Sequence, residues 1–400
     1  MRDKPEAESS SGRLFELVPD EIDRQISAYS EAEMELRLLE KRHRELTEDL
    51  LQAQRALRKV PDGEDAQIQK DVLDKVRLQI EVVNAQLDEV TENLISIASW
   101  LEANSESSHI GGKHRGLIKH RHPNRDFFLA DLFDYALKDD GATMEAPMFS
   151  LSTKPDLSIW EWTSKDGNKS VRVAPSVLGR ATQHDKDILI YVVSQLVEGL
   201  NRGREDARNR TVRFTVYDFL VTTNRQTSGD GYQRLHEAFE RLRGTTITTD
   251  IRTGGERIRQ GFGIFDEWRI IEKSPTDERM IAVEVTLSRW LYNAVQAFEV
   301  LTIHPDYIRL RKPLARRLYE IARKHCGHQA QWTISLELLQ EKAGSKSSLR
   351  EFRRALRAIQ DDDSLPEYRF VLGGDDRVTF YVRDPQRLAR GIAKRIEGGR

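Results

Sequence analysis

The segment 211–271 limits the fold more than any other, because its hydrophobic spacing changes from a helical to a strand-like period. Its first part predicts a short helix with Thr215 as the N-cap, and then a turn over residues 226–231, where two glycines stand among small polar residues. A second helix is expected to begin near Asp230 and to end at Gly244. The apolar faces of these helices contain Val216, Phe219 and Leu220, and then Leu235, Phe239 and Leu242.

The second part of the segment predicts a β-hairpin. Residues 245–251 are rich in β-branched side chains, which favour a strand, and Thr253–Glu256 has the composition of a turn. Residues 263–271 are expected to return as the partner strand. Helix, turn, helix and hairpin is the order of a winged helix, whose second helix enters the major groove of DNA. A small α+β module that binds protein would have the same order, so both interpretations stay open.

Charge is unevenly distributed along the 400 residues, although the net charge is only −2. Residues 1–103 contain 24 acidic and 14 basic side chains, a balance of −10, which leaves a balance of +8 for the remainder. A basic C-terminal part is compatible with nucleic-acid binding, because contact with DNA depends on local rather than total charge.

Composition indicates a soluble, cytoplasmic protein of two or three domains. The single cysteine, Cys326, excludes an internal disulfide. No apolar run approaches the roughly 20 residues that a membrane helix needs. The N-terminal residues lack the apolar core of a signal peptide.

Residues 1–19 are polar and are expected to form a disordered tail, and residues 20–103 predict an antiparallel coiled-coil hairpin broken at Pro61–Asp65. Either the two arms bury each other, or the hairpin pairs with another chain and makes a homodimer, or it is a solvated spacer. The seam of the second arm contains Leu73, Val76, Ile80, Val83, Leu87, Val90, Leu94, Ile97 and Leu101.

A basic linker is expected at residues 104–125. It would contact DNA phosphates or serve only as a tether. His120 and His122 suggest the paired histidines of nicking enzymes, but that motif has an apolar residue between them, where this chain has Arg121.

Several uncommon blocks resemble the plasmid replication initiator protein A family over roughly residues 120–275. They are Asp126–Asp131, Lys138–Asp140, Met144–Ser152, Lys154–Asp156, Val173–Ser176, Gly179–Thr182, Asp185–Tyr191 and Ser194–Leu196. The resemblance implies a winged-helix protein without a catalytic centre or cofactor, which binds double-stranded DNA at the plasmid origin. It also implies the host initiator and the replicative helicase as partners, with repression of its own promoter and a role in copy control. Residues 1–103 lie outside the resemblance.

The remaining elements predict a repeat of the same module. A helix over residues 185–200, capped by Asp185, would open the first copy, and a third strand over 280–287 and a helix over 288–298 would close it. The second copy would contain a helix from Lys312, a strand at 332–334, helices over 336–342 and 348–360, and a hairpin of residues 367–372 and 377–382. The expected fold is therefore α+β: the hairpin, then winged helices at 126–299 and 300–385, then a basic tail at 386–400.

Candidate DNA contacts follow from the two predicted recognition helices, because arginine binds guanine edges and phosphate in a bidentate manner. In the second module, Arg350, Arg354 and Arg357 are spaced i, i+4, i+7 opposite an apolar stripe. A solvated surface is the alternative for all candidates. The others are Lys346, Ser347 and Arg377 in the second module, and Arg225, Thr227, Gln233, Arg234, Arg241, Arg252, Arg257 and Arg259 in the first.

Motifs of catalysis and metal binding are missing from the sequence. There is no P-loop, and Cys326 with its neighbouring histidines lacks the ligand spacing of a zinc site. We therefore expect a non-enzymatic initiator of plasmid replication that binds origin repeats and recruits host proteins. A transcriptional repressor and a DNA-nicking replication enzyme are the alternatives.

Overall fold

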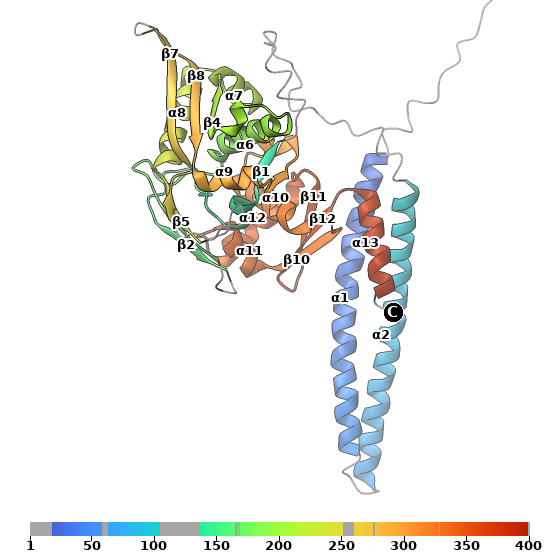
Figure 1. Cartoon of the computed structure of the whole chain (residues 1–400). Helices are drawn as coiled ribbons and strands as arrows, with labels where there is room; N and C mark the ends of the chain where they lie inside the picture. Colours follow the sequence, from blue (N-terminus) through green and yellow to red (C-terminus); the bar gives the residue numbers. More distant parts are fainter. Residues whose placement is uncertain are drawn as a thin grey trace, which may run out of the picture. The chain divides into compact units, whose positions relative to one another are not determined.

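The computed structural model describes residues 18–57, 63–104, 137–164, 167, 169–250, 260–274, 277–327 and 329–398 (Figure 1). Its contacts divide the chain into two compact units. We call them the helical unit, made of residues 1–113, 329–331 and 381–400, and the mixed unit, made of residues 114–328 and 332–380.

The helical unit contains two 40-residue helices that run side by side in opposite directions, α1 (Val18–Leu57) and α2 (Glu64–Ala103) (Figure 1). The spacing of three and four residues predicted this pairing, because it places one apolar stripe along each helix. Most of the predicted seam of α2 is buried, and the rest of it is half-buried. The buried seam residues are Leu46 and Ala53 of α1 and Leu73, Val83, Val90, Leu94, Ile97 and Leu101 of α2.

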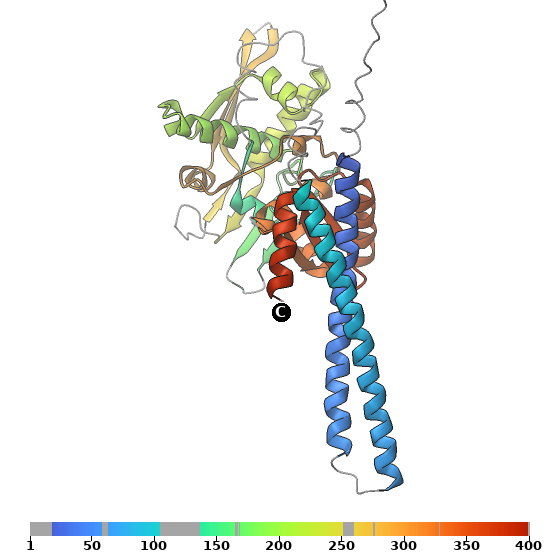
Figure 2. The same ribbon diagram turned by 90° about the vertical axis from the view of Figure 1, so that its right-hand side faces the viewer.

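A third helix, α13 (Pro385–Gly398), packs along α2, as Figures 1 and 2 both show. These residues were expected only as part of a basic tail. The helix buries Leu388, Ala389 and Ile392 on one face. Glu33 of α1 is fully buried and accepts hydrogen bonds from the Tyr381 hydroxyl at 2.6 Å and from the Gln331 amide at 2.7 Å. The Arg395 guanidinium of α13 also donates to Glu33, so one carboxylate joins three segments of this unit.

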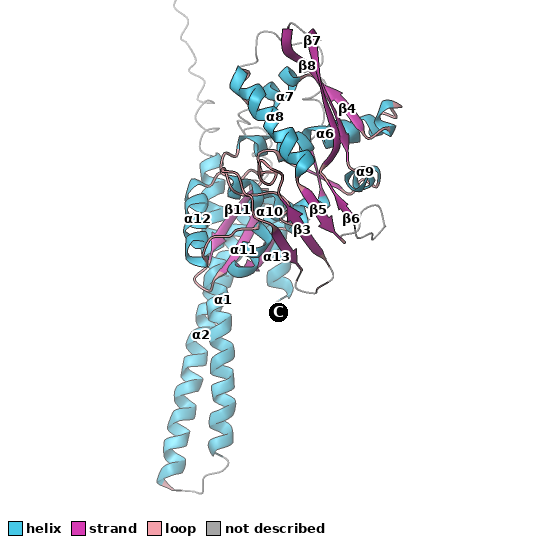
Figure 3. Ribbon diagram, turned by 90° about the vertical axis from the view of Figure 1, so that its left-hand side faces the viewer, coloured by secondary structure: helices cyan, strands magenta, loops and turns pink. Residues whose placement is uncertain are grey.

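The first half of the mixed unit is built around the sheet β4-β8-β7. All pairings in this sheet are antiparallel: β8, the last strand in sequence, lies in the middle and pairs with β4 and with β7. Figure 3 shows the sheet beside α7 and α8. The elements in chain order are α6 (Lys186–Asn201), η2 (Asp206–Arg208), β4 (Thr211–Phe214), α7 (Val216–Thr222), α8 (Gly229–Gly244), β7 (Phe265–Ser274), β8 (Asp277–Leu287) and α9 (Arg289–Gln296).

The hairpin predicted from residues 245–251 and 263–271 is wrong. Residues 246–249 form β5, which pairs with β3 and with β6 in a separate sheet, whereas residues 265–274 pair with β8. The sequence pattern identified strands but not partners, and β3 lies more than 70 residues before β5. The second sheet has the order β2-β3-β5-β6 and contains β2 (Trp160–Thr163), β3 (Ser170–Ala174), β5 (Thr246–Thr249) and β6 (Gln260–Phe262).

The second half of the mixed unit repeats the plan of the first. Its sheet has the order β10-β12-β11, so the first strand again pairs with the last. Earlier in the chain, β1 (Lys138–Asp140) leads into α5 (Gly141–Glu145). The strand β1 pairs with β9 (Val300–Thr302), which precedes the second half. The elements of the second half are η3 (Pro305–Arg309), α10 (Pro313–Cys326), β10 (Gln331–Ser335), α11 (Leu336–Ala343), α12 (Leu349–Asp362), β11 (Tyr368–Leu372) and β12 (Arg377–Val382).

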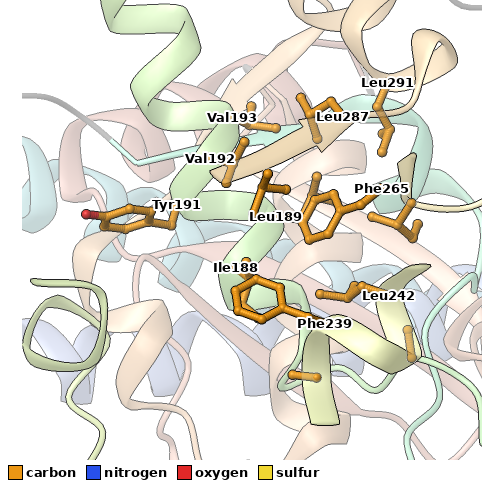
Figure 4. Packing of buried hydrophobic residues seen from close by; sticks show 14 of the residues in the cluster. Ile188, Leu189, Tyr191, Val192, Val193, Phe239, Leu242, Phe265, Leu287 and Leu291 are labelled. Carbon is orange, nitrogen blue, oxygen red and sulfur yellow. The ribbon is translucent and has the colours of Figure 1, made fainter. Parts of the chain in front are cut away.

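Helix α6 runs through the centre of the hydrophobic core in the first half of the mixed unit (Figure 4). Ile188, Leu189 and Val192 of this helix are fully buried. They lie among side chains of α8, β7, β8 and α9, which Figure 4 shows converging on the helix from several sides. The labelled partners are Phe239, Leu242, Phe265, Leu287 and Leu291.

Buried charges join α6 to α10. The Lys186 ammonium lies 2.7 Å from the Asp139 carboxylate and 3.1 Å from that of Glu320, and all three side chains are buried. Glu320 also accepts a hydrogen bond from the Tyr307 hydroxyl at 2.6 Å. Such a network is stable only when every charge has a partner, so it fixes the two helices against each other.

Candidate nucleic-acid interface

Helix α12 presents the row of arginines that the sequence predicted. Ser348 and Glu351 form a capping box that fixes the first residue of the helix. Phe352, Leu356 and Ile359 are buried on one face, as the period of 3.6 residues requires.

Arg350, Arg354 and Arg357 are exposed on the other face of α12. None of the three makes a hydrogen bond or an ion pair with a residue that the structure describes. The neighbouring Arg353, by contrast, is held 2.7 Å from the Asp376 carboxylate at the turn before β12. The three guanidinium groups are therefore available to a ligand, whereas the fourth arginine of this helix stabilises the module.

The turn between α11 and α12 is fixed by its backbone conformation and by contacts of its side chains. Gly344 has a φ of 72°, and a Cβ there would lie 2.6 Å from the Pro147 side chain, so both the backbone and the space require glycine. Lys346 binds Asp156 at 3.0 Å, which makes it an anchor for the loop. The Ser347 hydroxyl lies 2.9 Å from that of Ser345, and Arg377 is exposed at the start of β12.

The Asp156 carboxylate binds both Arg180 and Lys346. Burial opposes its ionisation, but hydrogen bonds from Ser158, Arg180 and Lys346 hold the pKa of its carboxyl well below the usual range. The carboxylate is thus ionised near neutral pH and fixes Lys346 in place.

The first module uses two of its candidate arginines as structural ties. Arg241 of α8 binds the Asp185 carboxylate through two nitrogens at 2.7 and 2.9 Å. Arg225 binds Asp187 at 2.9 Å and the His184 carbonyl at 2.6 Å. Both therefore connect the helix–turn–helix segment to α6.

Asp185 was predicted to cap α6, but the structure gives it another role. Its carboxylate makes no capping hydrogen bond and instead accepts from Arg241 and from the Thr182 backbone amide at 2.9 Å. A charged partner outcompetes a helix amide here, because the guanidinium offers two parallel donors.

The other candidates of the first module are solvent-facing or lie outside the described residues. Thr227, Gln233 and Arg234 are exposed, and the Gln233 amide donates to Glu237 at 3.3 Å. The remaining three, Arg252, Arg257 and Arg259, lie outside the described residues.

A cleft of about 670 Å³ lies in the mixed unit beside α8. Its walls come from residues 152–155, from the turn 223–226, from α8 and from residues 308–316. Lys154 and Arg311 line it, and neither was among the predicted DNA contacts, although Lys154 lies in one of the family blocks. Neither belongs to a periodic motif, and only the folded chain brings them to the same cavity.

Within the described ranges, the structure shows no group of three or more histidine, cysteine, aspartate or glutamate side chains placed to hold a metal ion. Cys326 is buried. No helix in the described part of the chain is long and apolar enough to cross a membrane.

Comparison with known proteins places the chain among replication proteins. A curated protein of Wigglesworthia glossinidia brevipalpis, described as "Putative replication protein", is 36% identical over 264 residues, or 65% of this chain and 94% of that protein. Two crystal structures of RctB domains 2 and 3 have TM-scores of 0.45 and 0.42 at 12% identity. They cover 61% and 62% of this chain and 98% and 99% of the solved chains. The family model of Replication initiator protein A matches residues 138–370, more than half of the sequence, and the chain therefore belongs to the replication initiator protein A family.

Proposed function

We propose that this chain is a sequence-specific DNA-binding initiator of plasmid replication that binds repeats at the origin and has no catalytic activity of its own. The observation that carries the proposal is the row of Arg350, Arg354 and Arg357 on α12, exposed and without partners among the described residues. Membership of the replication initiator family supplies the context in which this basic row contacts DNA.

Each half of the mixed unit is, in this proposal, a winged helix. The support is the shared order of helix, strand, helix, helix and hairpin, together with sheets in which the first strand pairs with the last. The second helix of each pair, α8 in one copy and α12 in the other, then enters a major groove. In this arrangement the hairpin of β7 and β8 is the wing of the first copy.

The two modules contribute differently to DNA binding. Three free guanidinium groups make α12 the principal reader, because each suits bidentate contact with a guanine edge. In α8, Gln233 and Arg234 are the exposed contacts, and Arg241 holds the helix in position.

Beyond the DNA, we propose the host initiator and the replicative helicase as partners, and repression of the chain's own promoter as a route to copy control. The helical hairpin is proposed to be a coiled coil that supports homodimer formation. These proposals rest on family membership and on the length of the hairpin.

An origin-dependent replication assay in cells that lack the protein tests the function directly. Replication of a plasmid with the cognate origin should require this chain, whereas a transcriptional repressor would regulate a promoter and leave replication unaffected. A nicking enzyme would leave protein covalently attached to supercoiled origin DNA, and we expect none.

Selection of bound fragments from random DNA provides a second, independent test. Two modules in tandem on one chain predict direct repeats of an asymmetric site. Recovery of palindromes alone, without direct repeats, would contradict the proposed origin function and favour a repressor, whereas palindromes beside direct repeats would fit a homodimer acting at the chain's own promoter.

A further inference from the structure

The cleft beside α8 is strongly basic. Seven lysine and arginine side chains line it, against three carboxylates, Asp185, Asp187 and Glu237. Burial lowers the pKa of His184, so this residue adds no positive charge near neutral pH. The balance of charge on the walls is therefore +4 in a cavity of about 670 Å³.

The buried carboxylates of the cleft are already neutralised. Asp185 is bound by Arg241, and Asp187 is bound by Arg225 and by Arg316. Three exposed cations remain: Lys154, Arg234 and Arg311 make no ion pair within the described ranges. They come from three separate segments of the chain and converge on one cavity.

Arg180 also lines the cleft, but a carboxylate of the fold already holds it. Its side chain is only 2% exposed and binds Asp156 through one terminal nitrogen at 2.6 Å. Its Nε has no hydrogen-bond partner although it is buried. Arg180 is therefore fixed in the wall of the cleft, and the exposed cations are the groups that a ligand would reach.

We propose that this cleft binds phosphate groups, with Lys154, Arg234 and Arg311 neutralising their charge. Phosphate suits the walls because it offers several acceptor oxygens to guanidinium groups. The walls also contain the apolar side chains of Pro155, Leu178 and Ile308, and the cleft has room beside them for an attached sugar or base.

Two sources supply this chemistry. One is the backbone of a bound duplex, because α8 and the turn before it form a wall of the cleft, and this source rests on the proposed DNA-binding function. The other is a free nucleotide, which does not require that function.

A pair of matched double variants of the full-length chain tests the proposal. Lys154→Gln with Arg311→Gln removes two cleft cations. Arg208→Gln with Arg289→Gln removes two exposed arginines that do not line the cleft. Arg234 is left in place because it is also a proposed reader of DNA. Thermal unfolding of both variants, compared with the unmodified chain, shows whether the fold is retained.

The first measurement is calorimetric titration with inorganic tripolyphosphate. We expect binding to the unmodified chain and to the control variant, and a loss of affinity of about tenfold or more in the cleft variant, as expected when a ligand loses more than 1.4 kcal/mol of interaction. The second is the salt dependence of duplex binding. If the slope of log affinity against log salt concentration falls by about two in the cleft variant alone, the phosphates that the cleft binds are those of the duplex backbone.

A lowered salt slope in the cleft variant alone supports the cleft as a duplex contact even where tripolyphosphate binding is unchanged. Loss of tripolyphosphate binding with an unchanged salt slope supports the cleft and assigns it to a free nucleotide. If neither measurement separates the cleft variant from its control, the proposal is wrong. Failure of the DNA-binding proposal would appear separately, as absence of sequence-specific binding by the unmodified chain.

Discussion

Arginines of one helix have different roles because their partners differ. On α12, Arg353 is paired with Asp376, whereas Arg354, the next residue, extends from the helix without an ion pair among the described residues. An arginine without a partner in the fold can be replaced at little cost in stability, and any effect of its loss must then come from a ligand.

Single alanine replacements of Arg350, Arg354 and Arg357 should therefore leave the fold intact. Replacement of a residue that contacts a base should reduce the discrimination between cognate and scrambled DNA by about 1–3 kcal/mol. Loss of a residue that contacts only phosphate should weaken binding to both DNAs equally. It should also lower the slope of log affinity against log salt concentration by about one. Affinities for both DNAs at two salt concentrations make the distinction.

Arg353→Ala is the matched control on the same helix, because its guanidinium is already engaged with Asp376. It should leave discrimination unchanged. If all three test variants bind cognate DNA like the unmodified chain, α12 is not the reader, and the second module is better explained as a protein-binding domain.

Asp139 should make stability depend on pH. Burial raises the pKa of its carboxyl to about 7, with Lys186 opposing the rise and Glu320 and Asp140 adding to it. The pKa in an unfolded chain is about 3.9, so between these values only the folded state holds the proton. Stability from this carboxyl is therefore fully present below about pH 4 and is lost as the pH rises through about 7.

Replacement of Asp139 with Asn should remove this dependence. Between pH 4.5 and 6.5 the free energy of unfolding should fall with pH by on the order of 1 kcal/mol per unit more in the unmodified chain than in the variant. Denaturant titrations at several pH values measure the difference. The exposed Asp361→Asn change serves as the control and should leave the slope as it was.

At the scale of elements, the two long helices are held by a narrow seam. Leu94 is 2% exposed and Leu87 is half-buried, whereas Leu78 of the same helix is 62% exposed. Helices of this length gain most of their stability from packing rather than from intrinsic propensity. Charges on the seam and charges on the outer face should therefore have very different effects.

The double variant Leu87→Asp/Leu94→Asp should lose much of the helix content of α1 and α2, because it places two charges in the seam at a cost of several kcal/mol. DNA binding by the mixed unit should be retained. Circular dichroism and a binding assay measure the two effects. Leu78→Asp should change neither, and loss of DNA binding in the seam variant would show that the two units depend on each other.

The whole chain forms its helical unit from three separate segments. Residues 329–331 and 381–400 join the N-terminal helices, so the hairpin of residues 20–103 is only part of this unit. Glu33 is the common contact of these segments, and it lies close to the N-terminus of the described chain.

Glu33→Ala should destabilise the helical unit by about 1–3 kcal/mol, because it leaves the buried hydroxyl of Tyr381 and the half-buried donors of Gln331 and Arg395 without their acceptor. Hydrogen exchange in α1 and α13 should accelerate together. The exposed Glu31→Ala change, two residues away, is the control. Faster exchange in α1 alone would mean that Glu33 does not join the segments.

The sequence by itself determined the elements with local signals. Heptad spacing predicted the paired helices, the helix expected over 348–360 is capped by Ser348, and Thr215 caps α7 as expected. Family blocks within residues 126–196 identified the initiator family that the comparison then showed. Each of these depends on residues close together in the chain, where period and capping chemistry act directly.

Only the tertiary structure decided partners distant in sequence. It paired β5 with β3 and β6 rather than with residues 263–271, and it assigned Arg241 to a carboxylate 56 residues away. It also folded α13 onto α2, where a basic tail was expected. A local pattern shows that a side chain is charged or that a strand will form. The partner depends on which distant segments the core brings together, and no local period records that.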